Sequence, residues 1–142
     1  ILFRVAIRRL ILYIKDNFNL KIFYEDTDLA GIVYYANYLK FIERARSEML
    51  SNLNISQKEL FKDGKFFVVT DLKAKYLLPA FFCDNLEVVT ELQEVKGASL
   101  LLSQKVFRST ELLFKASINL ALLKKNGKVT RLPANIRQLL ET

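Results

Sequence analysis

The segment Tyr24–Arg46 reads YEDTDLAGIVYYANYLKFIERAR and decides the fold of this chain. It joins an acidic cluster, a turn of small residues and the start of a long amphipathic pattern: Glu25, Asp26 and Asp28, then Ala30 and Gly31, then Asn37. A carboxylate therefore stands close to a helix start. The first N–H groups of a helix have no partner inside it and carry partial positive charge, so they can hold an oxygen that becomes negative. One segment can thus supply both an attacking group and an oxyanion site.

The part of this segment after Asn37 predicts a helix with one buried stripe. Apolar residues recur at helical spacing, at Tyr38, Phe41, Ile42, Ala45, Met49 and Leu53. The pattern stops at about residues 52–54. Ser56 and Glu59 have the spacing of a capping box, which predicts a second, short helix that ends near Gly64.

Alternating apolar and polar residues predict strands on both sides of these helices. β-prone residues indicate a strand over 19–25. After the helices, strands are expected over 66–76, 86–96, 100–108 and 112–123, and Asn126-Gly127 predicts a tight turn that returns 128–132 along the last of them. Pro133 opens a short C-terminal helix with Ile136, Leu139 and Leu140 on one side. One long helix before an antiparallel meander predicts an α+β fold whose sheet curls around that helix.

The same segment resembles the signature of the hotdog-fold acyl-CoA thioesterases, the 4-hydroxybenzoyl-CoA thioesterase family, in the YbgC-like branch associated with the Tol-Pal cell-envelope system. The matching residues are Tyr24, Asp26, Thr27, Asp28, Ala30, Gly31, Val33, Tyr34, Asn37, Tyr38 and 43–46. A weaker likeness runs from about Asn19 to the C-terminus. The resemblance implies a hotdog fold, hydrolysis of acyl-CoA to free acid and coenzyme A, no metal or redox cofactor, and a dimer or tetramer with an active site shared between two subunits. Where the branch has His, this chain has Tyr35, as in the 4-hydroxybenzoyl-CoA thioesterase pattern.

The composition narrows the chemistry that the chain can perform. It contains no histidine and one cysteine, Cys83. Without an imidazole it has no Ser-His-Asp triad, no Cys-His pair and no His-based zinc helix, and a single thiol cannot build a thiolate metal site. Hydrolysis must therefore use carboxylates, backbone dipoles, hydroxyls or bound cations.

Length and charge set the expected organisation and partners. The 142 residues, 51% of them hydrophobic, fit a single domain over 19–142, preceded by a basic amphipathic extension over 1–18. That extension either packs on the domain or a partner subunit, or attaches to an anionic membrane surface. No run is long and apolar enough to span a bilayer, so we expect a cytoplasmic protein, with peripheral contact at the inner face of the membrane as the alternative. The net charge of +7 favours anionic partners.

The resemblance assigns the central catalytic roles to two residues. Asp28 matches the family's essential aspartate; it would attack the thioester carbonyl or activate a water as general base, and the sequence leaves both open. The backbone N–H of Tyr35 matches the position that polarises the thioester oxygen, and a main-chain donor survives the exchange of His for Tyr. The Tyr35 side chain either shapes the acyl pocket or only packs. Asp26 either orders the turn or faces Asp28.

Five further residues are candidates for substrate binding. Gly31 either lets the chain approach the substrate or serves a plain turn, and Asn37 either caps the helix or contacts the ligand. The phosphates of coenzyme A need cations near the tunnel mouth, for which the positions of Lys96 and Arg131 are suitable, with Ser99 as a hydrogen-bond donor.

Two other classes of function stay open. A non-catalytic acyl-CoA or acyl-carrier-protein binding module would keep the tunnel but release no thiol. A basic adaptor for a membrane surface or nucleic acid is favoured by charge alone, and the expected strand faces carry few aromatics among their Lys and Arg residues, so nucleic acid is not an expected partner.

Overall fold

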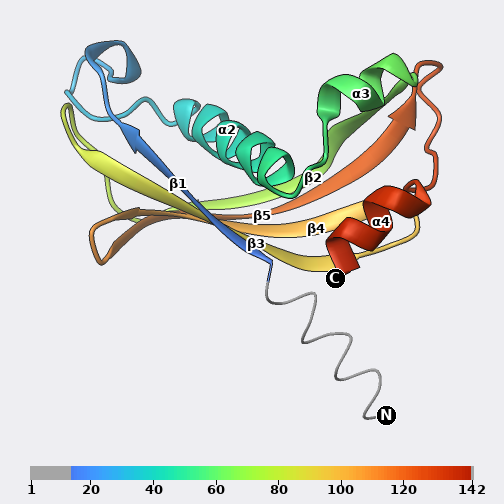
Figure 1. The fold of residues 1–142 in the computed structure, drawn as a ribbon. Helices are drawn as coiled ribbons and strands as arrows, with labels where there is room; N and C mark the ends of the chain where they lie inside the picture. Colours follow the sequence, from blue (N-terminus) through green and yellow to red (C-terminus); the bar gives the residue numbers. More distant parts are fainter. Residues whose placement is uncertain (1–13, 142) are drawn as a thin grey trace.

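Five antiparallel strands form one sheet that curls around the helix α2 (Figure 1). This computed structural model describes residues 14–141 of the chain. The elements, in chain order, are β1 (Lys15–Lys21), the 3-10 turn η1 (Tyr24–Asp26), α2 (Asn37–Asn52), α3 (Gln57–Lys62), β2 (Lys65–Tyr76), β3 (Asn85–Val95), β4 (Ser99–Arg108), β5 (Glu111–Lys124) and α4 (Ala134–Glu141). The strands lie in the order β1-β3-β4-β5-β2, so β1 and β2 are the edges. The α+β arrangement expected from the sequence is confirmed.

The core lies between α2 and the concave face of the sheet. The predicted apolar stripe of α2 is buried, with Phe41, Ile42 and Ala45 at most 1% exposed. These side chains meet inward-facing strand residues such as Leu102 and Ile118, both 0% exposed. Burying each large aliphatic or aromatic side chain contributes about 1.5–3 kcal/mol, so this one stripe accounts for much of the attachment of α2 to the sheet.

The short helices also form as the sequence predicts. The Ser56 hydroxyl accepts the N–H of Glu59 at 3.1 Å, which caps α3, and Gly64 follows its end with φ +74°. α4 follows Pro133 and buries Ile136 and Leu140. Among residues 14–141, no helix combines the length and the apolar content that crossing a bilayer requires.

The first strand begins and ends earlier than the sequence indicated. β1 pairs with β3 from Lys15 opposite Glu91 to Lys21 opposite Asn85, so the prediction of a strand over 19–25 was wrong in its bounds. Residues 15–18, which were expected in the extension, belong to the sheet, and residues 1–13 lie outside the described part. Only alternate residues of β1, such as Phe18 and Leu20, face the core, and the polar residues between them hid the pattern.

The predicted return along β5 after the Asn126-Gly127 turn is confirmed, but it is short: the N–H of Lys124 donates to the Lys128 carbonyl and that of Thr130 to the Leu122 carbonyl, both at 2.9 Å. After the turn at Gly127, where φ is +82°, the chain makes one isolated bridge, between Leu123 and Val129. The reason is topological, because β5 is an interior strand already paired with β2 on one side and β4 on the other. β4 begins at Ser99, opposite Ala121 of β5, so only the residues of β5 after Ala121 have a free edge.

Candidate active site

The segment between η1 and α2 folds back on itself beside one end of the sheet (Figure 1). Thr27 forms a bridge with Val33, and the N–H of Asp28 donates to the carbonyl of Ile32 at 2.9 Å. Gly31 closes the turn with φ +79°, in the left-handed region that favours glycine. A Cβ built on Gly31 would meet nothing within 4 Å, so the conformation of the turn, rather than crowding within the chain, requires glycine here.

Asp28 both holds this turn and presents a carboxylate to solvent. Its Oδ1 accepts the N–H of Ala30 at 2.8 Å, which is the turn-capping contact typical of Asp. None of the described residues donates to Oδ2, and the side chain is exposed. The turn therefore uses one oxygen, which fixes the orientation of the carboxylate, and leaves the other available for chemistry.

The start of α2 is tied to the same segment through the main chain of Asp26. The Asp26 carbonyl accepts the N–H of Tyr34 and the Nδ2 of Asn37, both at 2.9 Å, and its carboxylate accepts the N–H of Phe23 at 2.8 Å. Asp26 thus orders the turn. The N-cap of α2 is Ala36, so the expectation that Asn37 caps the helix was wrong. Its side chain instead reaches back to the loop, as the first residue inside the helix.

The N–H of Tyr35 donates to no acceptor among residues 14–141. At the start of α2 the N–H groups of Asn37 and Leu39 are already used, because they donate to the carbonyls of Tyr34 at 2.9 Å and Ala36 at 3.2 Å. The N–H of Tyr35, just before them, is the kind of donor that a developing oxyanion needs, and it follows Asp28 on the same folded-back segment.

Tyr76, at the end of β2, holds the peptide of Tyr35 from the other side. Its hydroxyl donates to the Tyr35 carbonyl at 2.9 Å, and its ring packs edge-on against those of Tyr35, Tyr38 and Phe114. Burial, with a smaller contribution from Tyr35, raises the pKa of Tyr76, so the hydroxyl stays a neutral donor. The sequence analysis placed Tyr76 only on a strand. The available signal was its position, the last inward residue of that strand before Pro79.

Arg108 and Asp84 fix the neighbouring loop that connects β2 to β3. Arg108 Nη1 lies 2.8 Å from Asp84 Oδ2 and donates to the Pro79 carbonyl at 3.1 Å. The same carboxylate oxygen accepts the N–H of Phe81 at 2.8 Å, and Phe81 forms a bridge with Ile32. Hydrogen bonds to Asp84 and then Glu111 raise the pKa of Arg108, which stays charged. The ion pair is therefore connected to the Asp28 segment through Phe81 and its bridge to Ile32.

The three residues proposed for phosphate binding lie together, at a different place. Lys96 and Ser99 flank the turn between β3 and β4, where the Lys96 N–H donates to the Ser99 carbonyl at 2.8 Å. The guanidinium of Arg131 lies 4.0 Å from where a Cβ on Gly97 would be. Arg137, which the sequence analysis did not single out, donates to the carbonyls of this turn at Lys96 and Gly97.

This turn is at the opposite end of the strands from Asp28 (Figure 1). β3 begins beside the Asp28 segment, because Asp84 accepts the N–H of Ile22, and it then runs 11 residues to Val95. At about 3.3 Å per residue, the strand separates its two ends by about 35 Å. Within one chain, Lys96, Ser99 and Arg131 therefore do not meet Asp28 and Tyr35.

Large apolar side chains are exposed around the Asp28 segment. They come from the segment itself and from the loop after β2: Phe23, Tyr24, Leu29, Tyr34, Tyr35, Leu77, Leu78, Phe81 and Phe82. Leu29 is fully exposed and Tyr24 is 81% exposed. A soluble monomer seldom leaves so many together, and such patches mark surfaces that another molecule covers. Within the described residues no group of His, Cys, Asp and Glu is arranged to hold a metal ion.

Comparison with known proteins finds the same fold and related sequences. A family model described as the thioesterase superfamily matches residues 30–115. The acyl-CoA thioesterase YbgC of Haemophilus influenzae is 44% identical over 106 residues, which cover 74% of this chain and 78% of that protein. The acyl-CoA thioester hydrolase YbgC of Escherichia coli O157:H7 is 40% identical over 93 residues, 66% of this chain and 69% of that protein. The crystal structure of a probable thioesterase from Bartonella henselae superposes with a TM-score of 0.80 at 31% identity, covering 84% of this chain and 99% of that one.

Proposed function

Because this chain belongs to the thioesterase superfamily, in its YbgC-like branch, we propose that it hydrolyses the thioester of acyl-CoA to a free acid and coenzyme A. One observation carries the proposal within the structure. The exposed carboxylate of Asp28, with one oxygen bound by the turn and the other free, shares a folded-back segment with the unpaired N–H of Tyr35.

In the proposed reaction Asp28 acts on the thioester carbonyl carbon, either as the nucleophile or through a water that it deprotonates. The N–H of Tyr35 stabilises the negative charge that develops on the carbonyl oxygen; removing one such donor costs about 2.7–4 kcal/mol of transition-state stabilisation. The leaving group is a thiol, whose pKa is about 8.5 for cysteine, so it departs without a strong general acid. A chain without histidine is suited to such a reaction.

The proposed site is completed by a second copy of the chain. The apolar patch around Asp28 needs a cover, and the cations suited to phosphate lie at the other end of the strands. A second copy related by a two-fold axis perpendicular to the strands runs its strands in the opposite direction, so its Lys96 and Arg131 approach the Asp28 end of the first copy. A dimer, or a tetramer made of two dimers, meets this requirement. In that assembly Asn37 holds the helix start and Gly31 holds the turn.

A non-catalytic module that binds acyl-CoA or an acyl carrier protein is the main alternative, because the same surface would bind without turnover. A basic adaptor at the inner face of the membrane is the second, and it rests on charge alone. For the enzyme we propose a cytoplasmic location, where acyl-CoA is made and used.

The test is release of thiol from short, long and aromatic acyl-CoAs by the wild type and by Asp28→Asn. Asn keeps an oxygen that accepts the Ala30 N–H, so the turn survives while the charge is lost. We expect the variant to lose at least about 100-fold in kcat, the usual contribution of a base or nucleophile. The matched control is Asp63→Asn, at an exposed position after α3. Equal rates for Asp28→Asn and wild type on every substrate would rule out the enzymatic proposal.

A further inference from the structure

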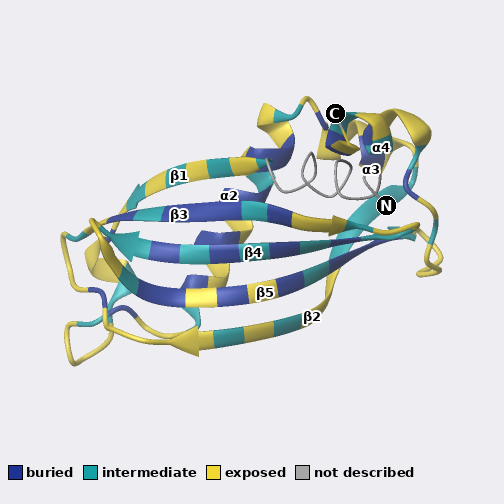
Figure 2. Ribbon diagram, turned by 90° about the horizontal axis from the view of Figure 1, so that it is seen from below, coloured by how far each residue is buried: buried dark blue, intermediate teal, exposed yellow. Residues whose placement is uncertain are grey.

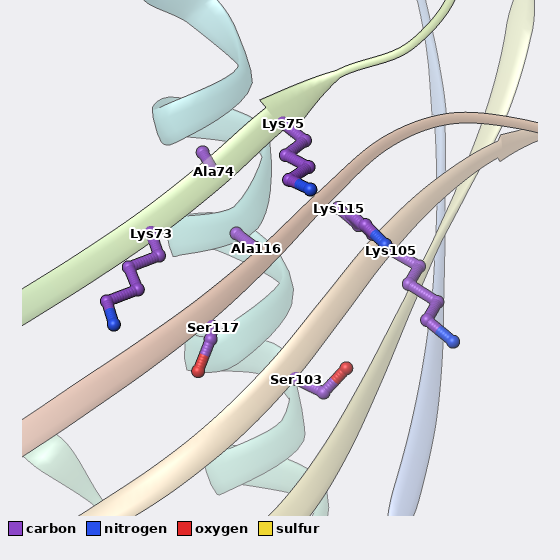
Figure 3. Close-up of a pocket in the computed structure, with 8 residues that line it drawn as sticks. All are labelled: Lys73, Ala74, Lys75, Ser103, Lys105, Lys115, Ala116 and Ser117. Atoms are coloured by element: carbon purple, nitrogen blue, oxygen red, sulfur yellow. The ribbon is translucent and has the colours of Figure 1, made fainter.

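Three lysines stand side by side on the face of the sheet that points away from α2. The register places Lys75 of β2 opposite Lys115 of β5, and Lys115 opposite Lys105 of β4. Phe114, next to Lys115, stacks on Tyr38 of α2, and Gln104, next to Lys105, donates to the Ile42 carbonyl of α2. Because neighbouring residues of a strand point to opposite faces, the lysines point outward. Figure 3 shows their side chains in front of the strands, with α2 behind.

The lysines surround a hollow of about 310 Å³. A fourth lysine, Lys73, lies one row away, where the register also places Ser117 opposite Ser103. The hollow is lined by the four lysines, by Ser103 and Ser117, and by Ala74 and Ala116 (Figure 3). We call these six residues the lysine row: Lys73, Lys75, Lys105, Lys115, Ser103 and Ser117.

This arrangement works against the stability of the isolated chain. Like charges directly opposite each other on neighbouring strands repel. None of these lysines forms an ion pair with an acidic group among residues 14–141, and residues 1–13 contain no Asp or Glu. Lysines on an edge strand protect it from pairing with other chains, which accounts for Lys73 and Lys75 on β2. It does not account for Lys105 and Lys115, which lie on interior strands.

The surroundings limit what can occupy the row. A second copy applied through the same face would bring its own four lysines against these and be repelled. A flat anionic membrane would also contact the acidic side chains on this face, where Asp71 stands two residues before Lys73 on β2 and Glu91 lies opposite Ser103. The positive charge is therefore confined to the part of this face between those carboxylates. Figure 2 shows this face of the sheet, with the strands in the order β1-β3-β4-β5-β2.

We propose that the lysine row binds a compact polyanion that carries two or more phosphate groups. Lysine ammonium groups bind phosphate as point charges, and serine hydroxyls donate to its oxygens. Neighbouring strands are about 4.8 Å apart, so three adjacent ammonium groups can contact successive phosphates of one chain. The volume lies at the lower end of the range for small-molecule sites, about 300–1,000 Å³. The ligand is either a free polyphosphate or the phosphates of coenzyme A, and the site is separate from Asp28 in either case.

Titration calorimetry with inorganic tripolyphosphate on the 142-residue chain tests the proposal. We expect the wild type to bind, and Lys105→Gln/Lys115→Gln to bind at least about tenfold more weakly, because two charge-assisted contacts are lost. The matched control is Lys58→Gln/Lys128→Gln, which removes the same charge from exposed positions elsewhere. Binding by the wild type should weaken between about 50 mM and about 300 mM NaCl, because salt screens the charges.

Further measurements separate the sources of phosphate and protect the test against misfolding. Weaker binding of coenzyme A to the Lys105→Gln/Lys115→Gln variant identifies the phosphates as those of coenzyme A, whereas unchanged coenzyme A binding identifies a free polyphosphate. The variant should melt at or above the temperature of the wild type, since repulsion is relieved. The proposal fails if tripolyphosphate does not bind or if both double variants bind it equally. It also fails if the Lys105→Gln/Lys115→Gln change weakens binding only to vesicles of phosphatidylglycerol.

Discussion

At the scale of single residues, the main-chain N–H of Tyr35 depends on contacts from two directions. Asp26 and Asn37 fix the peptide segment from one side, and the hydroxyl of Tyr76 binds the Tyr35 carbonyl from the other. The identity of residue 35 matters less than the geometry of its peptide. The side chain at position 35 can therefore vary without loss of the N–H donor, provided that the carbonyl of residue 35 keeps its hydrogen bond from Tyr76.

We therefore expect Tyr76→Phe to lower kcat by about three- to tenfold with little change in KM, because a hydrogen bond contributes about 0.5–1.5 kcal/mol while the ring packing is retained. Steady-state kinetics on the best acyl-CoA measures this split. Tyr24→Phe is the control, since the Tyr24 hydroxyl binds none of the described residues. Because the pKa of Tyr76 is raised, the contact persists below its ordinary value of about 10 and is lost only as the pH rises through the folded value. An equal loss in both variants would contradict the positioning role.

Gly31→Ala should destabilise the chain by about 1–2 kcal/mol, because an alanine at φ +79° is strained even where its Cβ has space. Activity should fall further than stability, since the strain moves the turn that orients Asp28. Gly97→Ala is the control, because the φ of Gly97 lies outside the left-handed region and its Cβ would meet only Arg131 at 4.0 Å. Thermal melts and thiol release together measure the two effects, and equal melting temperatures for both variants would contradict the conformational argument.

At the scale of elements, one buried polar contact fixes α2 on the sheet. Gln104 of β4 accepts from Arg46 at 3.0 Å and donates to the Ile42 carbonyl at 2.8 Å and to Thr90 at 2.9 Å. Both Gln104 and Thr90 are 0% exposed, and burial lowers the pKa of Arg46, which Glu43 partly offsets. Burial of the apolar stripe holds α2 against the sheet, and the hydrogen bonds of Gln104 fix the position of the helix along the strands.

Replacing Gln104 with Leu should therefore destabilise the fold by about 1–3 kcal/mol, because the guanidinium of Arg46 loses its buried partner. Adding Arg46→Met to the same chain should recover part of the loss, since no buried charge then lacks a partner. Urea unfolding of the two single variants and the double variant gives the coupling energy. Strictly additive effects would show that the two side chains act independently.

At the scale of the whole molecule, the apolar patch around Asp28 lies at one end of the sheet. The candidates for phosphate binding, Lys96, Ser99 and Arg131, lie at the other end. In the proposed mechanism a chain arranged in this way needs a second copy to complete its site. The proposed two-fold assembly covers the patch and brings the two ends together, so assembly and activity should be lost in parallel.

Phe82→Asp should dissociate the assembly and reduce thiol release, because a charge would enter a surface that the second copy covers. Phe61→Asp is the matched control: Phe61 is 60% exposed, close to the 52% of Phe82, but lies on α3 away from the Asp28 end. Light scattering after size exclusion gives the mass of each variant. A wild type that is monomeric and active at low concentration would contradict a shared site.

Most of the secondary structure can be predicted from local patterns in the sequence. The stripe of α2, the cap at Ser56 and the alternation of β2 to β5 identify their elements within one or two residues, because each depends on periodicity or on contacts between near neighbours. The start of β1 was missed because only two of its apolar residues face the core. The turn at Asn126-Gly127 was predicted correctly because its signal is local, whereas the short length of the return along β5 depends on the free edge, which the order of the sheet decides.

The sequence by itself determined the elements, the family and the carboxylate Asp28 with its neighbouring helix start, since these depend on residues close together in the chain. Only the tertiary structure decided that Tyr76 binds the Tyr35 peptide, that Lys96 and Arg131 lie about 35 Å of strand away from Asp28, and that three lysines from separate strands form one row. These facts join residues distant in the chain, and strand order and register, set by burial of the whole core, bring such residues together.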